Sequence, residues 1–123
     1  MPKTVWIAGW LLALLATTSP ALAQERSPAA RQNLVELSRV LGESHAIRQA
    51  CEGSAEQQWR ERMAQMLERE DADQALKARL SIAFNDGYHS GMALYPKCSP
   101  AARAEGRRIA ASGQALSGKL GSP

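Results

Sequence analysis

Cys51 and Cys98 are the only two cysteines in this chain of 123 residues, and they constrain its fold more than any other feature. Two thiols allow a single intramolecular pairing. On the chain-entropy model, a disulfide across this long segment restricts the unfolded state and adds about 4 kcal/mol of stability. That gain is comparable to the whole net stability of a small domain, about 5 kcal/mol at the low end.

The first residues indicate the compartment in which these thiols reside. Lys3 supplies a positive charge, an apolar run follows from Val5 to Ala16, and small residues close the stretch at Ala21-Leu22-Ala23. This order is typical of a secretory signal peptide, so we expect residues 1–23 to be removed by cleavage after Ala23. An uncleaved anchor is the alternative. It is disfavoured because a bilayer requires roughly 20 apolar residues and this run is shorter.

Export would place both cysteines in an oxidising compartment, where thiols pair. We therefore expect a Cys51–Cys98 disulfide, with free thiols or a bridge to another chain as the alternatives. The expected location is the periplasm, with an extracellular destination left open. No later segment is apolar enough to span a membrane, so we expect no transmembrane segment in the mature chain.

The mature part has a modest apolar content. Removing residues 1–23 leaves 100 residues, enough for one domain, in which Leu, Ile, Val and Phe total only 15. Subtracting Lys3 from the net charge of +3 leaves +2, so self-repulsion is weak and a small core suffices. We expect residues 24–123 to form a single helical domain, ordered from about residue 30 to 117.

Apolar residues at helical spacing predict an all-α fold, a small bundle of four or five helices with one disulfide. Ser27 and Pro28 are typical of a helix start, and we expect that first helix to end at Gly42. Residues 43–51 are predicted to form a short second helix with Cys51 in its last turn. Gly53 would follow with a positive φ.

The remaining helices are predicted from their caps. Ser54-Ala-Glu-Gln57 matches a capping box, which would open the helix carrying Trp59 and Leu67. Asp73 is the expected N-cap of a helix that ends before Pro96. Within that helix Asp86-Gly87 is a possible turn, but the apolar period continues through it and favours one helix.

Ser99-Pro100 repeats the cap-then-proline pattern and predicts an Ala-rich last helix through Leu116, with residues 117–123 frayed. Arg103, Arg107 and Arg108 give this helix a basic face, which could meet phosphate groups of the envelope or simply be solvated. The excess charge and the number of aromatics are too small to indicate nucleic-acid binding. No nucleotide-binding or catalytic motif is present, so we expect no enzyme activity and no cofactor.

Two metal sites are worth considering. His45, Cys51, His89 and Cys98 are zinc-ligand types, but six helical residues separate His45 from Cys51 and turn them to different faces. Met63, Met66 and Met92 could form a soft copper site, although Met63 and Met66 share the apolar stripe where methionine fills a core. We therefore predict no metal site.

Three polar residues, Arg48, Arg60 and Asn85, fall close to the predicted core stripe. A buried polar group must find hydrogen-bond partners or cost about 1 to 3 kcal/mol. The structural interpretation is that Asn85 caps a helix and that the arginines pair with Glu side chains. The functional interpretation is an interaction site.

Several short segments together resemble an uncharacterised family of small exported proteins from alphaproteobacteria, a domain of unknown function. They are Leu41-Gly42, His45, Ile47-Arg48, Cys51, Trp59-Arg60, Met63, Phe84-Asn85, Gly87-Tyr88 and Cys98. The resemblance covers roughly residues 34–116 and implies a signal peptide and a disulfide, without an assigned function. His89 and Met66 lie outside its pattern, which weakens both metal hypotheses.

The resemblance directs attention to six candidate interaction or structural residues: His45, Arg48, Trp59, Arg60, Asn85 and Tyr88. The leading functional hypothesis is a non-enzymatic periplasmic helical module that binds an unknown protein or an envelope component. A small periplasmic stress chaperone is the alternative, and a metal-handling protein is a third.

Overall fold

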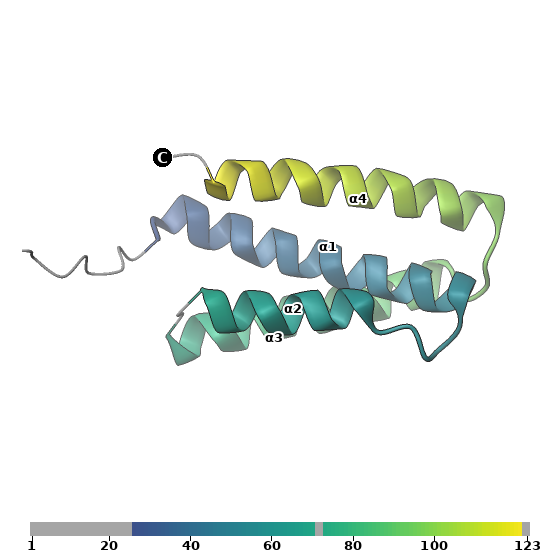
Figure 1. The fold of residues 1–123 in the computed structure, drawn as a ribbon, viewed down its shortest axis with the longest axis horizontal. Coiled ribbons are helices and arrows are strands. Elements are labelled where there is room, and N and C mark those ends of the chain that lie inside the picture. The colour runs from purple at the N-terminus through teal and green to yellow at the C-terminus, as the bar shows by residue number, and fades with distance from the viewer. Residues whose placement is uncertain (1–25, 71–72, 122–123) are drawn as a thin grey trace, which may run out of the picture.

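The computed structural model describes residues 26–70 and 73–121, and this part of the chain is built from helices alone (Figure 1). The four helices are α1 (Pro28–Glu52), α2 (Gln58–Arg69), α3 (Gln74–Leu94) and α4 (Pro100–Gly121). The predicted all-α class is confirmed, with four helices. The predicted signal peptide, residues 1–23, lies outside the described residues.

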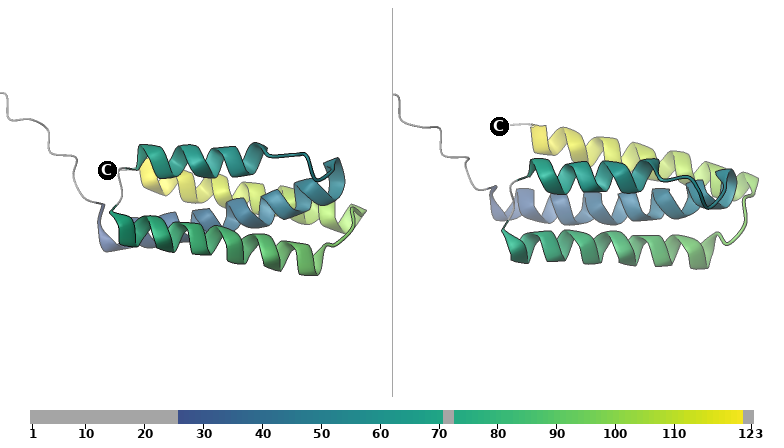
Figure 2. Two further views of the ribbon diagram at one scale, coloured as in Figure 1. Left: turned by 90° about the horizontal axis from the view of Figure 1, so that it is seen from below. Right: turned by 60° about the horizontal axis from the view of Figure 1, so that its bottom comes forward.

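The helix α1 is the centre of the bundle. The helices α3, α4 and α2 all pack on α1, and α2 also touches α3 (Figures 1 and 2). Within the described ranges, α4 has no close backbone contact with either α2 or α3. One helix therefore carries most of the tertiary structure, and the space between α2 and α4 is not closed by direct packing of their backbones.

The predicted break at Gly42 is wrong, because α1 continues through it to Glu52. Gly42 lies at the contact between α1 and α3, where an added Cβ would be 2.0 Å from the carbonyl oxygen of Phe84. In the same way, a Cβ added to Gly87 on α3 would lie 2.0 Å from the carbonyl oxygen of Arg39 on α1. Both glycines allow two helix backbones to touch, so Gly42 serves packing and does not end a helix.

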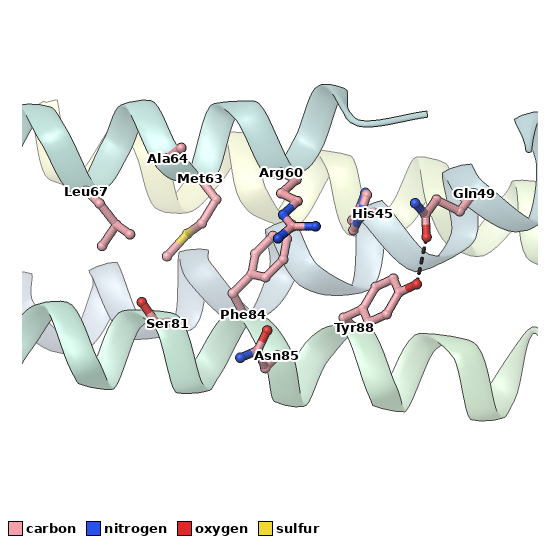
Figure 3. Close-up of a pocket in the computed structure, with 10 residues that line it drawn as sticks. All are labelled: His45, Gln49, Arg60, Met63, Ala64, Leu67, Ser81, Phe84, Asn85 and Tyr88. Atoms are coloured by element: carbon pink, nitrogen blue, oxygen red, sulfur yellow. Dashed lines mark hydrogen bonds between the residues drawn. The ribbon is translucent and has the colours of Figure 1, made fainter. Parts of the chain in front are cut away.

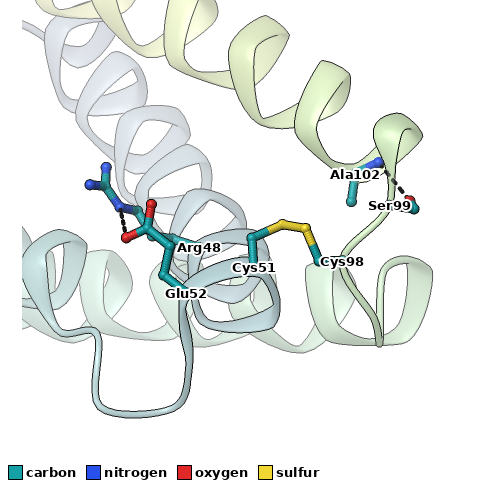
Figure 4. The surroundings of a disulfide bond; sticks show 6 residues. All are labelled: Arg48, Cys51, Glu52, Cys98, Ser99 and Ala102. Atoms are coloured by element: carbon teal, nitrogen blue, oxygen red, sulfur yellow. Dashed lines mark hydrogen bonds and ion pairs between the residues drawn. A yellow bond between two sulfur atoms is a disulfide. The ribbon is translucent and has the colours of Figure 1, made fainter.

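Three of the predicted N-caps are confirmed. The Oγ of Ser27 accepts from the Ala30 N–H at 3.1 Å, and Asp73 accepts from the N–H of Leu76 at 2.7 Å. At the start of α4, Ser99 Oγ accepts from the backbone of Ala102 at 3.0 Å (Figure 4). Each side chain satisfies a backbone donor that has no partner within its own helix.

The predicted capping box at Ser54 is wrong. The helix α2 begins at Gln58 with Gln57 as its N-cap, and the Gln57 side chain forms no capping hydrogen bond. The Glu56 carboxylate instead accepts from the Gln58 N–H at 2.7 Å. Ser54 lies in the preceding turn, where its carbonyl oxygen accepts from the Gln49 side chain at 3.0 Å. The end of α1 is as predicted, with Gly53 at a φ of 104°.

The predictions for the two C-terminal helices, α3 and α4, have different outcomes. The helix α3 continues through Asp86-Gly87, as the unbroken apolar period favours. The helix α4 extends to Gly121, beyond its predicted end at Leu116, while the fraying of residues 117–123 stays a prediction. Arg26 contributes at this end of the bundle, because it bonds the Glu70 carboxylate at 2.8 Å and the carbonyl oxygen of Leu120 at 3.3 Å.

Two apolar clusters lie on neighbouring faces of α1. The first joins α1 to α2 and α3 through Leu34, Leu37, Leu41, Met63, Leu76, Leu80 and Phe84. The second joins α1 to α4 through Val40, Ile47, Ala102 and Ile109. Because α1 contributes to both clusters, few large apolar residues suffice for a core.

The Cys51–Cys98 disulfide connects the last turn of α1 to the loop before α4, with Cα atoms 4.6 Å apart (Figure 4). The predicted pairing is confirmed in the structure. Since α1 is the one described helix with which α4 makes backbone contacts, this bond ties the loop before α4 to the helix on which α4 packs. None of the described helices is both long and apolar enough to cross a bilayer.

Candidate functional site

The six candidate residues fall on two sides of α2. His45, Arg60, Asn85 and Tyr88 line a hollow between α1, α2 and α3, whereas Arg48 and Trp59 line a groove between α2 and α4. Trp59 and Arg60 are consecutive, and about 100° of helix rotation directs them to the two different sides. The six residues that were selected from the sequence as one set therefore belong to two separate sites.

The first site, which we call the His45 hollow, has a volume of about 410 Å³ (Figure 3). Side chains of three helices point into it in the close-up. It is lined by His45, Gln49, Arg60, Met63, Ala64, Leu67, Ser81, Phe84, Asn85 and Tyr88. Its lining mixes apolar and polar side chains. Among the described residues that line it, Arg60 is the one with a permanent charge.

His45 is the most enclosed polar residue of the hollow, with 4% of its surface exposed. Its ring packs against Phe84 and Tyr88, with centroids at 5.8 and 5.1 Å. Burial lowers the pKa of His45 below its ordinary value, and the positive charge of Arg60 lowers the pKa further, with partial compensation from Glu56. The imidazole is therefore neutral at neutral pH.

The buried nitrogen Nδ1 of His45 has no hydrogen-bond partner. A buried N–H without a hydrogen-bond partner costs more free energy than a buried acceptor nitrogen without one. Burial of Nδ1 therefore favours the tautomer with its proton on Nε2. In this tautomer the neutral imidazole of His45 carries its N–H on Nε2, and the ring lines the hollow.

Arg60 extends from α2 toward the hollow (Figure 3). Among the described residues it forms no ion pair, so the predicted pairing with Glu is not found. Arg48, in contrast, pairs with Glu52 at 3.1 Å and lies 4.0 Å from Glu56. Asn85 is exposed at the edge of the hollow and forms no capping bond within the described chain, so that prediction is also wrong.

Tyr88 closes one end of the hollow. Its hydroxyl donates to Oε1 of Gln49 at 2.7 Å (Figure 3). The amide nitrogen of Gln49 donates to the carbonyl oxygens of Ser54 and Glu56, at 3.0 and 3.2 Å. Gln49 therefore links the ring of Tyr88 to the α1–α2 turn and fixes this end wall.

The balance of donors and charges makes the hollow suited to an anion. None of the described residues that line it carries a carboxylate, and its polar lining includes the Arg60 guanidinium, the His45 imidazole and the Asn85 amide. Ser81 is the nucleophile type present, yet the described residues include no hydrogen bond between Ser81 and a base. The arrangement can bind and orient a ligand but lacks the activated nucleophile of a hydrolase.

The second site, which we call the α2–α4 groove, consists of two adjoining hollows of about 290 and 480 Å³. Both are lined by Ser44, Trp59 and Ala110, so they form one continuous depression along α1. Its floor is mainly apolar. Arg103 and Arg107 lie on the α4 wall, and Arg62 lies over the Trp59 ring at 5.5 Å from the centroid.

A comparison with known families finds a match over most of the chain. The model of a family described as "Protein of unknown function (DUF2385)" matches residues 30–122. The chain belongs to the DUF2385 family. No curated protein and no solved structure matches it. The expected membership in a domain of unknown function is confirmed.

The structure of this DUF2385 chain bears on both the zinc and the copper hypothesis. Cys51 and Cys98 are bonded to each other, so they are not available as zinc thiolates together with His45 and His89. Met63 is buried in the first apolar cluster, where it packs as a core residue. The described part of the chain has no group of three or more His, Cys, Asp or Glu side chains arranged to hold a metal ion.

Sequence reasoning missed Gln49, Ser44 and Ser81, which line the two sites of the DUF2385 chain. Gln49 follows His45 by four residues and so shares its helix face, which was an available signal. Ser44 and Ser81 carried no such signal, because their roles depend on which helices pack beside them.

Proposed function

We propose that this chain is a non-enzymatic binding module of the bacterial envelope, exported to the periplasm, and that it binds an anionic envelope component in the His45 hollow. The single observation that carries the proposal is the Arg60 guanidinium, which has no ion-pair partner among the described residues and shares with the buried, neutral His45 a hollow whose described lining has no carboxylate. The disulfide is consistent with an oxidising compartment.

The ligand should carry a carboxylate or a phosphate. Arg60 lacks a counter-ion among the described residues, and an anion would supply one. Hydrogen bonds to a charged group contribute about 1.5 to 3 kcal/mol, more than bonds between neutral groups. The Nε2–H of His45 and the amide of Asn85 add donors that orient the same anionic group.

The ligand should also have a short apolar part. Met63, Leu67 and Phe84 supply apolar lining to the hollow. The volume of about 410 Å³ falls within the range of small-molecule sites, which is about 300 to 1,000 Å³. These two features together favour a small amphiphilic anion over a bare ion.

The proposal is tested by titrating purified, oxidised protein with octanoate, octyl phosphate and neutral octyl glucoside while NMR follows His45 and Tyr88. We expect both anions to shift these resonances and the neutral amphiphile to leave them unchanged. Arg60→Gln should weaken anion binding about tenfold, which corresponds to 1.4 kcal/mol.

Arg62→Gln is the matched control, because it removes the same charge from the same helix on the groove side. It should leave anion affinity unchanged. Equal weakening by the two substitutions, equal binding of octyl glucoside, or no shift at His45 with any probe would each refute the proposed site.

A further inference from the structure

We propose that the His45 hollow takes up a proton together with its anion, so that it holds the anion more tightly in acidic surroundings. His45 is the group that gains the proton, and the anion held by Arg60 makes this gain favourable. This coupling rests on the proposed function, because it concerns the same anion in the same hollow. It adds a regulation by pH that anion binding does not by itself require.

The enclosure of His45 keeps the imidazole neutral when the hollow is empty. Its ring packs against Phe84 and Tyr88 of α3, and 4% of the residue is exposed. Its Nδ1 is buried and has no hydrogen-bond partner. A proton added there would create a charged N–H without an acceptor among the described residues. This cost belongs to the fold, so a ligand in the hollow does not remove it.

Arg60 opposes the same proton by charge, and this opposition is what a ligand changes. Arg60 lines the hollow from α2 and has no ion-pair partner within the described part of the chain. Its positive charge is the second cause, after burial, that lowers the pKa of His45. An anion held by Arg60 cancels this repulsion and also attracts the imidazolium. Anion binding should therefore raise the pKa of His45.

The other charged groups near His45 leave Arg60 in control. Glu56, in the turn before α2, partly offsets the effect of Arg60 on the pKa of His45, and it lies 4.0 Å from Arg48. From α3 the facing titratable group is the neutral phenol of Tyr88, whose far side meets the exposed His89 at 5.7 Å between ring centroids. No described residue of α4 lines the hollow. Arg60 is thus the lining charge that an anion would neutralise.

Thermodynamic linkage makes the effect reciprocal. If the anion raises the pKa of His45, a proton on His45 raises the affinity for the anion by the same factor. Above both pKa values of His45, in the free and in the bound protein, the affinity does not depend on its protonation. As the pH falls between the two pKa values, the affinity increases. A pKa raised by about 0.5 corresponds to an increase of about threefold.

The test uses octanesulfonate, whose charge stays constant in the acidic range, so that only groups of the protein titrate. NMR follows the His45 ring of purified, oxidised protein between about pH 4 and pH 8, with circular dichroism to verify the fold at each pH. We expect saturating octanesulfonate to raise the pKa of His45 by about 0.5 or more. Calorimetry should show the affinity increasing about threefold or more toward acid pH.

Four variants assign the proton to His45 and the opposing charge to Arg60. His45→Gln should lose the increase in affinity toward acid pH, whatever its affinity at neutral pH. His89→Gln and Glu56→Gln remove the other nearby titratable groups and should retain the increase. Arg60→Gln should raise the pKa of His45 in the free protein and abolish the further rise with octanesulfonate.

The possible failures separate the coupling from the anion site itself. Octanesulfonate that binds with the same affinity at every pH and leaves the pKa of His45 unchanged would overturn the coupling, while the anion site would stand. No binding at any pH would overturn both. An increase in affinity that persists in His45→Gln would assign the proton to another group and overturn the coupling as proposed.

Discussion

Gly42 of α1 lies directly against the backbone of α3, where an added Cβ would stand 2.0 Å from the carbonyl oxygen of Phe84 and 2.9 Å from the nitrogen of Tyr88. A backbone atom inside a helix cannot move aside as a flexible side chain does. Gly42→Ala should therefore push α1 and α3 apart and lower the free energy of unfolding by about 3 kcal/mol. Urea denaturation followed by circular dichroism measures this loss.

Gly118→Ala is the control for the substitution at Gly42, because both glycines are helical and a Cβ at Gly118 meets nothing within 4 Å. Alanine favours a helix over glycine by about 0.5 to 1 kcal/mol, so this variant should be slightly more stable than the wild type. Equal stability of the Gly42→Ala and Gly118→Ala variants would contradict the close approach of α1 and α3 at Gly42.

Reduction of the Cys51–Cys98 disulfide should destabilise the protein by about 4 kcal/mol, since the bond closes a loop of 47 residues in sequence separation. Urea denaturation with and without reductant gives the difference. The double variant Cys51→Ser/Cys98→Ser should match the reduced protein and not respond to reductant. An oxidised and a reduced protein of equal stability would contradict the prediction.

Hydrogen exchange should locate the effect of reduction in α4. Among the described helices α4 makes backbone contacts with α1 only, and the disulfide anchors the loop that precedes α4. After reduction, amides around Ala102 and Ile109 should lose protection before those around Leu80 in α3. Earlier loss in α3 would show that the packing of α4 on α1 does not depend on the disulfide.

Ser99 and Ser54 provide a matched pair for the helix caps. Ser99 Oγ accepts from the backbone of Ala102 at the start of α4, so Ser99→Ala should cost about 1 kcal/mol. Ser54 contributes its carbonyl oxygen, which alanine retains, so Ser54→Ala should change the unfolding free energy little. Equal losses in the two variants would mean that Ser54 caps α2 after all.

The comparison of these serines explains how far the sequence determines the fold. Caps at Ser27, Asp73 and Ser99 could be predicted because each is followed by a clear helical period. Ser54 has the same local pattern, but Gln49 of the preceding helix binds the turn carbonyls and shifts the start of α2 to Gln58. Such competition from another element is not encoded in a local motif.

Glycine presents the same ambiguity at Gly42. A glycine after an apolar run predicts a helix end, and this is correct at Gly53. At Gly42 the missing side chain instead serves the contact with α3, and only the position of α3 distinguishes the two uses. For the same reason the sequence selected Trp59 and Arg60 together, whereas the packing of α2 divides them between two sites.

His45 should make stability depend on pH in the acidic range. Its pKa in the folded protein is lowered from the ordinary value of about 6.5 by burial first and by Arg60 second. As the pH falls below about 6.5, the unfolded chain takes up a proton at this residue before the folded chain does. The free energy of unfolding therefore decreases from about pH 6.5 down to the folded pKa, and His45 contributes no slope above that window.

Urea denaturation at a series of pH values should show this decrease, His45→Gln should reduce it, and His89→Gln, an exposed control on α3, should retain it. An identical slope in the His45→Gln variant would mean that the imidazole is not buried in its neutral form, and the anion site derived from it would lose its Nε2–H donor.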